Sequence, residues 1–255
     1  MKEIDRSFND TVRILLSSEL GGIDDYAKWL GRHIPLPLFR KSAISGKGVW
    51  IPPSFCFSGQ EFDKCRIIDI EEIDQVNTPP FDEGALENVN MRDILEIINP
   101  IAYYCGNLRY KNSNNIERSS AVGGASNIYY CEDIWYKTRN VAFSHTVLYS
   151  ENIFGSHMAR YSKFCINIYN SYQINRGLEI DGCTNCSDVF FCHNSENLRN
   201  CILCFNVKTL SYAVGNIEVG KERYMEIKDM LISHIVEKLK KEKDFETDIF
   251  NVGCC

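Results

Sequence analysis

The sequence lacks long hydrophobic runs and an excess of positive charge. No apolar segment approaches the roughly 18 residues that a membrane-spanning helix needs, and Met1–Arg6 is charged where a signal peptide would become apolar. Acidic residues outnumber basic ones by 34 to 28, giving a formal net charge of −6, whereas a dedicated nucleic-acid binder carries a basic excess. We therefore expect a cytoplasmic protein with no membrane and no nucleic-acid partner.

The sequence also lacks the common catalytic motifs. It contains no GxSxG nucleophile turn, no HExxH helix and no GxGxxG dinucleotide turn. Ser45–Gly48 resembles a phosphate-binding loop, but the upstream glycine and the Ser or Thr after the lysine are missing. We assign no catalytic residue and no cofactor, and the sequence favours a protein that is not an enzyme.

The sequence does contain a six-residue repeat, which runs through thirteen hexads from Arg139 to Asn216. The third and sixth places are never charged, and the sixth is mostly Ser, Ile or Cys. A weaker copy precedes the repeat, with a one-residue slip at Thr138. Such short-period self-similarity predicts a stacked solenoid, in which a recurring corner asparagine forms ladders and tolerates tight turns. Asparagine fills the second place at Asn140, Asn152, Asn170, Asn194, Asn200 and Asn206.

Odd and even hexads differ at the fourth place. In odd hexads this place is always apolar, as at Phe154 and Phe190, and in even hexads it is mostly polar, as at Glu196. The unit is therefore twelve residues, and one coil contains twelve residues or a small multiple. Arg139, Glu151, Lys163 and Arg199 should point outward. The residues expected to point inward are Val141, Val147, Ile153, Cys165, Ile168, Ile174, Ile180, Cys183, Cys192, Leu198, Cys201 and Leu210.

The repeat is flanked by expected helices. Ser7 is a candidate N-cap for a helix with apolar Phe8, Val12, Leu15, Leu16 and Leu20. After the repeat, an amphipathic helix carries Tyr224, Ile227, Leu231, Ile235 and Leu239, and we expect it to cap the solenoid end. The predicted fold is mainly β: a helical and irregular part (1–100), a parallel β-solenoid of ~12-residue units (101–217) and a capping helix (218–247).

The cysteines allow two interpretations. Two CxxC pairs and one histidine have the spacing of zinc ligands, at Cys183, Cys186, Cys192, His193, Cys201 and Cys204. The repeat explains the same spacing, because third and sixth places are always three residues apart, and free cysteine packs as a small hydrophobe. We favour core cysteines without a metal and keep zinc as the alternative.

Three histidines fall in one column of the repeat. His145, His157 and His193 occupy the first place of even hexads. In a twelve-residue coil His145 and His157 become neighbours about 4.8 Å apart, close enough to share a metal or another ligand. The other interpretation, which we favour, is a solvent-facing stripe of aromatic and polar side chains.

Residues 126–228 resemble a group of uncharacterised cysteine-rich repeat proteins of large tailed phages and of uncultured bacteria and archaea. The resemblance lies in the segments DVFFCHN (188–194), CFNVK (204–208), YAVGN (212–216) and VGKERY (219–224). It implies a solenoid followed by a C-terminal helix, and it implies no reaction. If a phage encodes the protein, its location would be the virion.

The sequence therefore favours a non-catalytic structural or assembly protein that presents a rigid solenoid surface, such as a virion component. The alternative is a metal-binding protein or enzyme that uses the histidine column or the Cys183–Cys204 cluster. We also expect a homo-oligomer or a stable complex with a protein partner. Its contacts should lie within Pro35–Pro100, where Trp50, Ile51, Phe55 and Phe57 would form an apolar patch.

Overall fold

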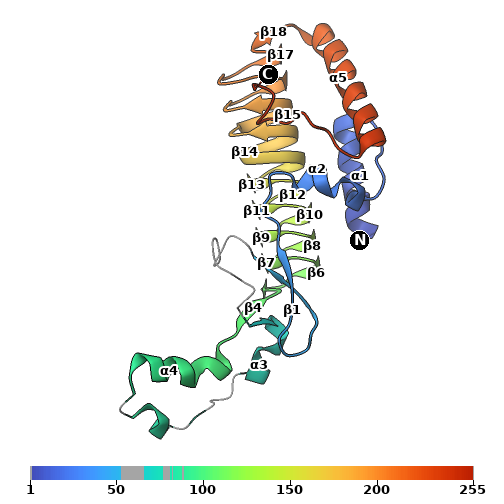
Figure 1. The fold of residues 1–255 in the computed structure, drawn as a ribbon. Coiled ribbons are helices and arrows are strands. Elements are labelled where there is room, and N and C mark those ends of the chain that lie inside the picture. Colours follow the sequence, from blue (N-terminus) through green and yellow to red (C-terminus); the bar gives the residue numbers. More distant parts are fainter. Residues whose placement is uncertain (1, 53–65, 77–80, 82, 88, 255) are drawn as a thin grey trace.

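Stacked parallel strands form a β-solenoid with helices along one side (Figure 1). This computed structural model describes residues 2–52, 66–76, 81, 83–87 and 89–254. None of the described helices has both the length and the apolar character that crossing a membrane requires. The helices are α1 (Lys2–Leu16), α2 (Ala27–Gly31), α3 (Ile73–Val76), α4 (Met91–Ile98) and α5 (Lys221–Glu242), with short 3-10 helices η1 (Ile23–Tyr26), η3 (Ile70–Glu72), η4 (Glu83–Leu86) and η5 (Asn99–Ile101).

The strands confirm a parallel solenoid with a coil of twelve residues. Strands two apart in the chain pair in parallel, so Val141 lies beside Ile153 and Ile153 beside Cys165. The strands of the solenoid are β5 (Arg109–Tyr110), β6 (Asn114–Glu117), β7 (Ser120–Gly123), β8 (Ser126–Tyr129), β9 (Glu132–Trp135), β10 (Arg139–Ala142), β11 (His145–Leu148), β12 (Glu151–Phe154), β13 (His157–Arg160), β14 (Lys163–Asp181), β15 (Thr184–His193), β16 (Arg199–Ile202) and β17 (Ser211–Val214).

The predicted slip is present as one coil of thirteen residues. Arg139 pairs with Ser126, and His145 with Glu132, thirteen positions back in each case. The extra residue is accommodated because Tyr136 and Lys137 both adopt a left-handed backbone conformation, with φ of 55°. A second thirteen-residue step lies in the first coil, where Arg109 pairs with Val122.

The backbone turns at every third residue. From Asn140 to Gly215, the second and fifth places of all thirteen hexads have φ between 44° and 67°, and only three of these residues are glycine. Each left-handed residue bends the chain, so a coil has four short sides with one inward side chain on each. Asparagine tolerates this conformation better than most residues, which explains its place in the repeat. Its side chains also form the predicted ladder, from Asn115 through Asn127 and Asn140 to Asn152.

The third and sixth places form the interior, as predicted. All of the residues expected to point inward are buried except Leu210, which is half-buried in the last coil. Arg139, Lys163 and Arg199 are exposed. Glu151 lies between Arg139 and Lys163, with N–O distances of 2.7 and 3.8 Å. These three outward charges therefore pair along the stack.

Inward serines satisfy the backbone of neighbouring coils. Ser144 Oγ donates to the carbonyl of Ala142 (2.8 Å) and accepts the amide proton of Ser156 (3.1 Å). Ser156 Oγ repeats this arrangement, accepting from the amide of Ile168 at 3.2 Å. An inward hydroxyl therefore provides a buried amide of the next coil with an acceptor, which such an amide needs.

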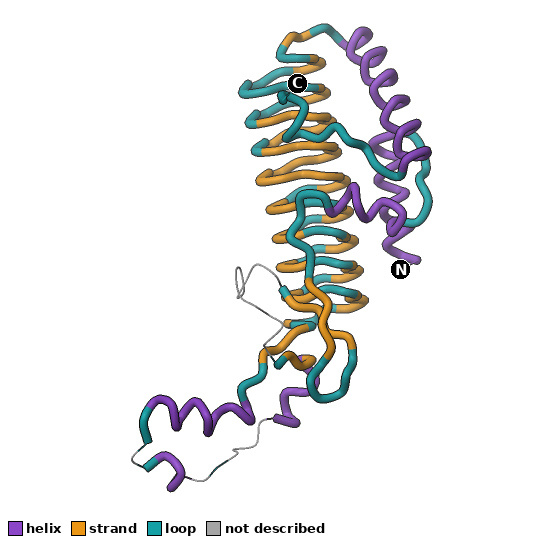
Figure 2. The backbone as a smooth tube through the Cα atoms, viewed as in Figure 1, coloured by secondary structure: helices purple, strands orange, loops and turns teal. Residues whose placement is uncertain are grey.

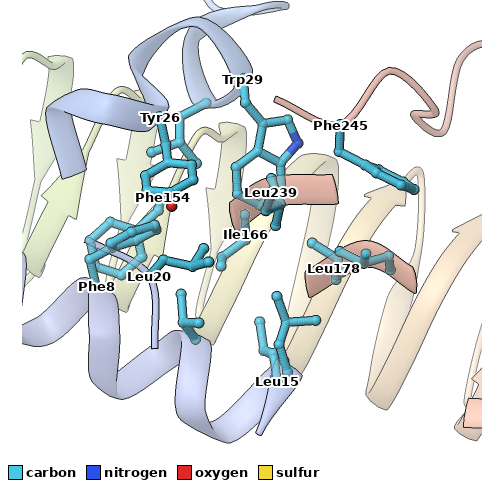
Figure 3. Packing of buried hydrophobic residues seen from close by; sticks show 14 of the residues in the cluster. Phe8, Leu15, Leu20, Tyr26, Trp29, Phe154, Ile166, Leu178, Leu239 and Phe245 are labelled. Atoms are coloured by element: carbon cyan, nitrogen blue, oxygen red, sulfur yellow. The ribbon is translucent and has the colours of Figure 1, made fainter. Parts of the chain in front are cut away.

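A second apolar core lies between the solenoid and the helices (Figure 3). The fourth places of odd hexads, including Phe154, Ile166 and Leu178, pack against Phe8 and Leu15 of α1. Trp29 of α2 and Leu239 of α5 are buried in the same cluster. The odd-hexad side of the solenoid is apolar because it carries these helices.

The two expected helices are present, with two differences from the prediction. Helix α5 runs beside the stack, not across its end (Figures 1 and 2), because Tyr224, Ile235 and Leu239 are buried in the lateral core. Helix α1 begins at Lys2, so Ser7 is not its N-cap and instead donates to the carbonyl of Glu3 within the helix.

Each end of the solenoid meets other secondary structure. At the C-terminal end, β18 (Ile217–Glu218) pairs antiparallel with β17. At the other end, β1 (Leu38–Lys41) and β2 (Gly48–Ile51) form a hairpin, and β3 (Ile67–Asp69) pairs with β4 (Tyr104–Gly106). Trp50 and Asn107 exchange hydrogen bonds of 2.8 and 2.9 Å, which fixes the hairpin to the first coil.

One residue of the expected exposed apolar patch, Ile51, is not exposed in the structure. Ile51 is buried with Val49 and Ile67, because the hairpin folds onto the first coil. Trp50 is half-buried and contacts the Tyr130 ring at 5.2 Å between ring centroids. Phe55 and Phe57 lie outside the described residues.

Gly155 marks the closest approach of α2 to the solenoid, and it gives a test of this docking. A Cβ atom at Gly155 would lie 2.7 Å from the Leu30 carbonyl oxygen of α2 and closer still to Asn167 Oδ1 of the next coil, whereas one at Gly215 would meet nothing within 4 Å. Both glycines have positive φ, so alanine costs each about 1–2 kcal/mol. We expect Gly155→Ala to destabilise the protein by about 1–3 kcal/mol more than Gly215→Ala, measured by denaturant unfolding. Equal losses would show that α2 does not dock here.

Ser156 tests the role of the inward hydroxyls. In Ser156→Ala the buried amide of Ile168 loses its acceptor, so unfolding free energy should fall by about 1–3 kcal/mol. Ser156→Cys should lose less, since Cys186 Sγ already accepts the amide of Leu198 at 3.4 Å in another coil. If the alanine and cysteine variants lose the same stability in urea titrations, the acceptor role is wrong.

Candidate functional site

His145 and His157 lie side by side on adjacent coils, as the coil spacing predicts. The favoured interpretation of a solvent-facing stripe is wrong for this column, because His145, Tyr169 and Asp181 are buried. Their rings are stacked at 16° with centroids 4.8 Å apart, and the two Nδ1 atoms are 2.8 Å apart. They stand on β11 and β13, which pair in register at these residues. The coil length alone produces this contact, because twelve residues separate them.

Polar residues of the preceding coil surround the pair. Thr146 Oγ1 donates to Asp133 Oδ2 (2.7 Å) and lies 3.0 Å from His145 Nδ1. Glu132 Oε2 lies 3.8 Å from His145 Nε2. Burial, together with the neighbouring His157, lowers the pKa of His145 to about 4, and burial also lowers the pKa of His157. Both rings are therefore neutral at pH 7, and one Nδ1 donates its proton to the other.

His193 belongs to the same column but not to the same cluster. Tyr169 and Asp181 occupy the two intervening coils. His193 Nδ1 lies 2.9 Å from Asp181 Oδ2, so its partner is a carboxylate and not another histidine. The column therefore places two histidines together and leaves the third apart.

The five candidate cysteines point into the solenoid, each buried. Cys192 and Cys204 share one inward column on adjacent coils, whereas Cys183, Cys186 and Cys201 each lie on a separate column. Cys183 Sγ donates to the carbonyl of Asp181 at 3.4 Å. His193 stands outside this interior, so the six candidate ligands do not converge. Within the described ranges, no group of three or more His, Cys, Asp or Glu side chains has a metal-binding arrangement. Burial raises the pKa of Cys131 and of Cys165 to about 12, which keeps these thiols protonated.

A further buried charged cluster holds the C-terminal segment 244–251 against the solenoid. Glu179 accepts hydrogen bonds from Asn167 Nδ2 (2.6 Å) and from the amide of Ile249 (3.1 Å). Asp248 lies 2.9 Å from His33 Nε2 and also pairs with Arg32. Burial raises the pKa of Glu179 to about 8. These groups are used within the protein to fix the segment.

An exposed aromatic ladder runs along the corner opposite the helices. It consists of Tyr136, Tyr149 and Tyr161, one residue on each of three successive coils. Their rings are nearly parallel, at 12° and 8°, with centroid distances of 5.3 and 4.9 Å. Even so, the three residues are 40–49% exposed. The ring faces cover one another, so each tyrosine presents its edge and hydroxyl to solvent.

The same column continues as a polar groove. Gln173, Asn185, Asn197 and Thr209 follow the ladder, since Tyr172 pairs with Thr184 and Thr184 with Glu196. The groove has a volume of about 480 Å³. We call it the amide groove; its lining residues are Gln173, Asn175, Asn185, Cys186, Ser187, Asn197, Arg199, Thr209 and Ser211.

Sequence reasoning missed this strip, although the signal is in the repeat. The fifth place of even hexads is Tyr149, Tyr161, Gln173, Asn185, Asn197 and Thr209. Every one of these residues has a left-handed backbone, which accounts for asparagine in the column but not for the large rings of Tyr149 and Tyr161. Exposed tyrosines that recur at one left-handed place are the signal that the sequence offers.

Comparison with known proteins adds no assignment. No protein-family model matches the chain, and no curated protein is significantly similar to it.

The buried histidine pair predicts acid sensitivity. Because the pKa of His145 in the folded protein lies below its ordinary 6.5, the unfolded chain binds more protons between pH 6.5 and 4. The stabilising contribution is therefore complete above pH 6.5 and is lost as pH falls toward 4, by roughly 1–3 kcal/mol. His145→Gln, which cannot titrate, should reduce this loss in urea titrations performed at pH 7 and pH 4.5. An unchanged loss in the variant would contradict the assignment.

Proposed function

We propose that the protein is a non-catalytic structural or assembly protein that presents one rigid outer strip of its solenoid to a partner. The observation that carries the proposal is the aromatic ladder: three large rings that are stacked in fixed positions yet 40–49% exposed. Ordered aromatic side chains at a surface are typical of binding sites. The strip consists of the ladder and the amide groove.

The interior supports this proposal because its reactive side chains already have structural partners. Inward serines and cysteines bond to backbone groups, as Ser171 Oγ does with the amide of Cys183. Burial raises the pKa of Cys131 and of Cys165, which makes these two thiols poor nucleophiles. Hydrogen bonds with Cys192 and Cys201 instead lower the pKa of Cys204, so that thiol is already partnered by other cysteines. Chemistry-bearing groups thus maintain the stack, and the outer surface is left for binding.

The placement of the other elements also supports it. Helices α1, α2 and α5 cover the odd-hexad side, and β18 and the β1–β2 hairpin pair with the terminal coils. The long even-hexad corner carries the ladder and the groove. The resemblance of residues 126–228 to phage repeat proteins favours a virion component; without a phage origin we propose the cytoplasm.

We further propose that the protein associates through α4, within the predicted segment Pro35–Pro100. This helix has an amphipathic sequence but buries no residue, and it projects away from the solenoid (Figure 1). Met91 is 69% exposed and Leu95 51% exposed. Large apolar side chains exposed together on one helix mark an association surface.

Light scattering tests the assembly proposal. We expect the untagged full chain to have a mass well above the 29.3 kDa of one chain, and Leu95→Glu to return it to a single chain. Met230→Glu is the matched control, since Met230 is 67% exposed on α5, and it should leave the mass unchanged. A wild-type protein that is monomeric at tens of micromolar would contradict the proposal.

A further inference from the structure

The strip offers a linear ligand the same kind of contact on every coil. The ladder contributes one tyrosine hydroxyl and ring edge per coil over three coils. The groove then contributes one side-chain amide or hydroxyl per coil, at Gln173, Asn185, Asn197 and Thr209. Successive contacts are separated by the rise of one coil, ~4.8 Å. A repeating extended polymer fits such a row, whereas a compact small molecule would use only part of it.

We propose that the strip binds a linear, uncharged polysaccharide whose chain lies along the solenoid axis. This inference rests on the proposed function and specifies the partner of the same strip. One pyranose unit of an extended β-1,4-linked chain advances by a distance close to the ~4.8 Å coil spacing, so over a few units successive sugars meet successive coils. Sugar hydroxyls both donate and accept hydrogen bonds, and side-chain amides do the same.

The geometry of the groove suits hydroxyl recognition. Asn185 Nδ2 donates to Asn197 Oδ1, which orients both amides along the groove. The neighbouring column adds Asn175, Ser187 and Ser211, which are also neutral donors and acceptors, and the guanidinium of Arg199, which donates to hydroxyl oxygens. Tyr161 and Tyr172 stand at the junction, with ring centroids 5.4 Å apart at 63°. The exposed edges of these rings provide apolar C–H surface beside a sugar unit.

Charge and pairing argue against the other polymers. Beside the ladder, Arg139 and Lys163 both pair with Glu151, and Arg160 is a single exposed arginine next to Tyr161. The strip therefore lacks the continuous basic track that nucleic acid requires. The ladder rings stack on one another, and a base could not intercalate between them without breaking the stack. The solenoid strands pair on both sides, for example β12 with β10 and β14, so a peptide could not add as a strand along this face.

The test is calorimetric titration of the full chain with hexasaccharides of β-1,4-linked glucose, N-acetylglucosamine or xylose. We expect millimolar or tighter binding of at least one probe. Tyr161→Asn and Asn185→Gly remove the ring and the amide but retain residues that tolerate a left-handed backbone. Each should weaken binding at least threefold, and the two together about tenfold or more.

Asn206→Gly is the matched control. Asn206 has the same left-handed conformation, with φ of 56° as at Asn185, but it lies outside the groove lining. It should leave the affinity unchanged.

Three results would overturn the inference: no binding of any probe at millimolar concentration, equal weakening by Asn206→Gly, or no effect of the strip variants. Light scattering on the same samples separates this failure from that of the proposed function. If no sugar binds but light scattering still shows an assembled protein, only the polysaccharide inference is overturned. If Tyr161→Asn dissociates the assembly without affecting any sugar, the strip is a protein interface. A monomeric wild-type chain that binds sugar would instead contradict the assembly proposal.

Discussion

The left-handed conformation at every third residue is the constraint on which this structure depends. It costs about 1–2 kcal/mol for most residues, and the solenoid adopts it at all 26 second and fifth places of the thirteen hexads. In return the chain closes a coil in only twelve residues and pairs its backbone with the coils on both sides. The narrow interior holds one side chain per side of each coil. This explains the Val, Ile, Ser and Cys residues at the third and sixth places.

The same constraint determines what the outer surface can present. Because the register is constant, residues twelve apart form straight columns, and a column can be specialised without disturbing its neighbours. The fourth place of odd hexads is apolar and receives the helices. The fifth place of even hexads, on the opposite corner, changes from tyrosine to amide along the rod. The same twelve-residue repeat therefore carries an apolar column that packs against the helices on one side and an exposed strip on the other.

The sequence was sufficient to predict the solenoid, its twelve-residue unit, the slip at Thr138 and the contact of His145 with His157. Each of these follows from periodicity alone. The position of α5 could not be predicted, because an amphipathic pattern shows that a face is buried but not what buries it. The separation of His193 from the cysteines was likewise hidden, because CxxC spacing is the same whether two thiols bind a metal or fill neighbouring inward columns of one coil. The aromatic ladder is visible in the sequence only after the coil length is known and the fifth places are compared.

The central claim is that the interior side chains maintain the fold and that function lies on the outer strip. It is tested most directly by metal analysis of untagged protein combined with mass spectrometry of alkylated thiols. The account predicts that the buried cysteines from Cys165 to Cys204 are reduced and that no metal is bound stoichiometrically. One zinc ion per chain, removed by a chelator together with loss of the folded state, would contradict it and would favour the metal-binding alternative.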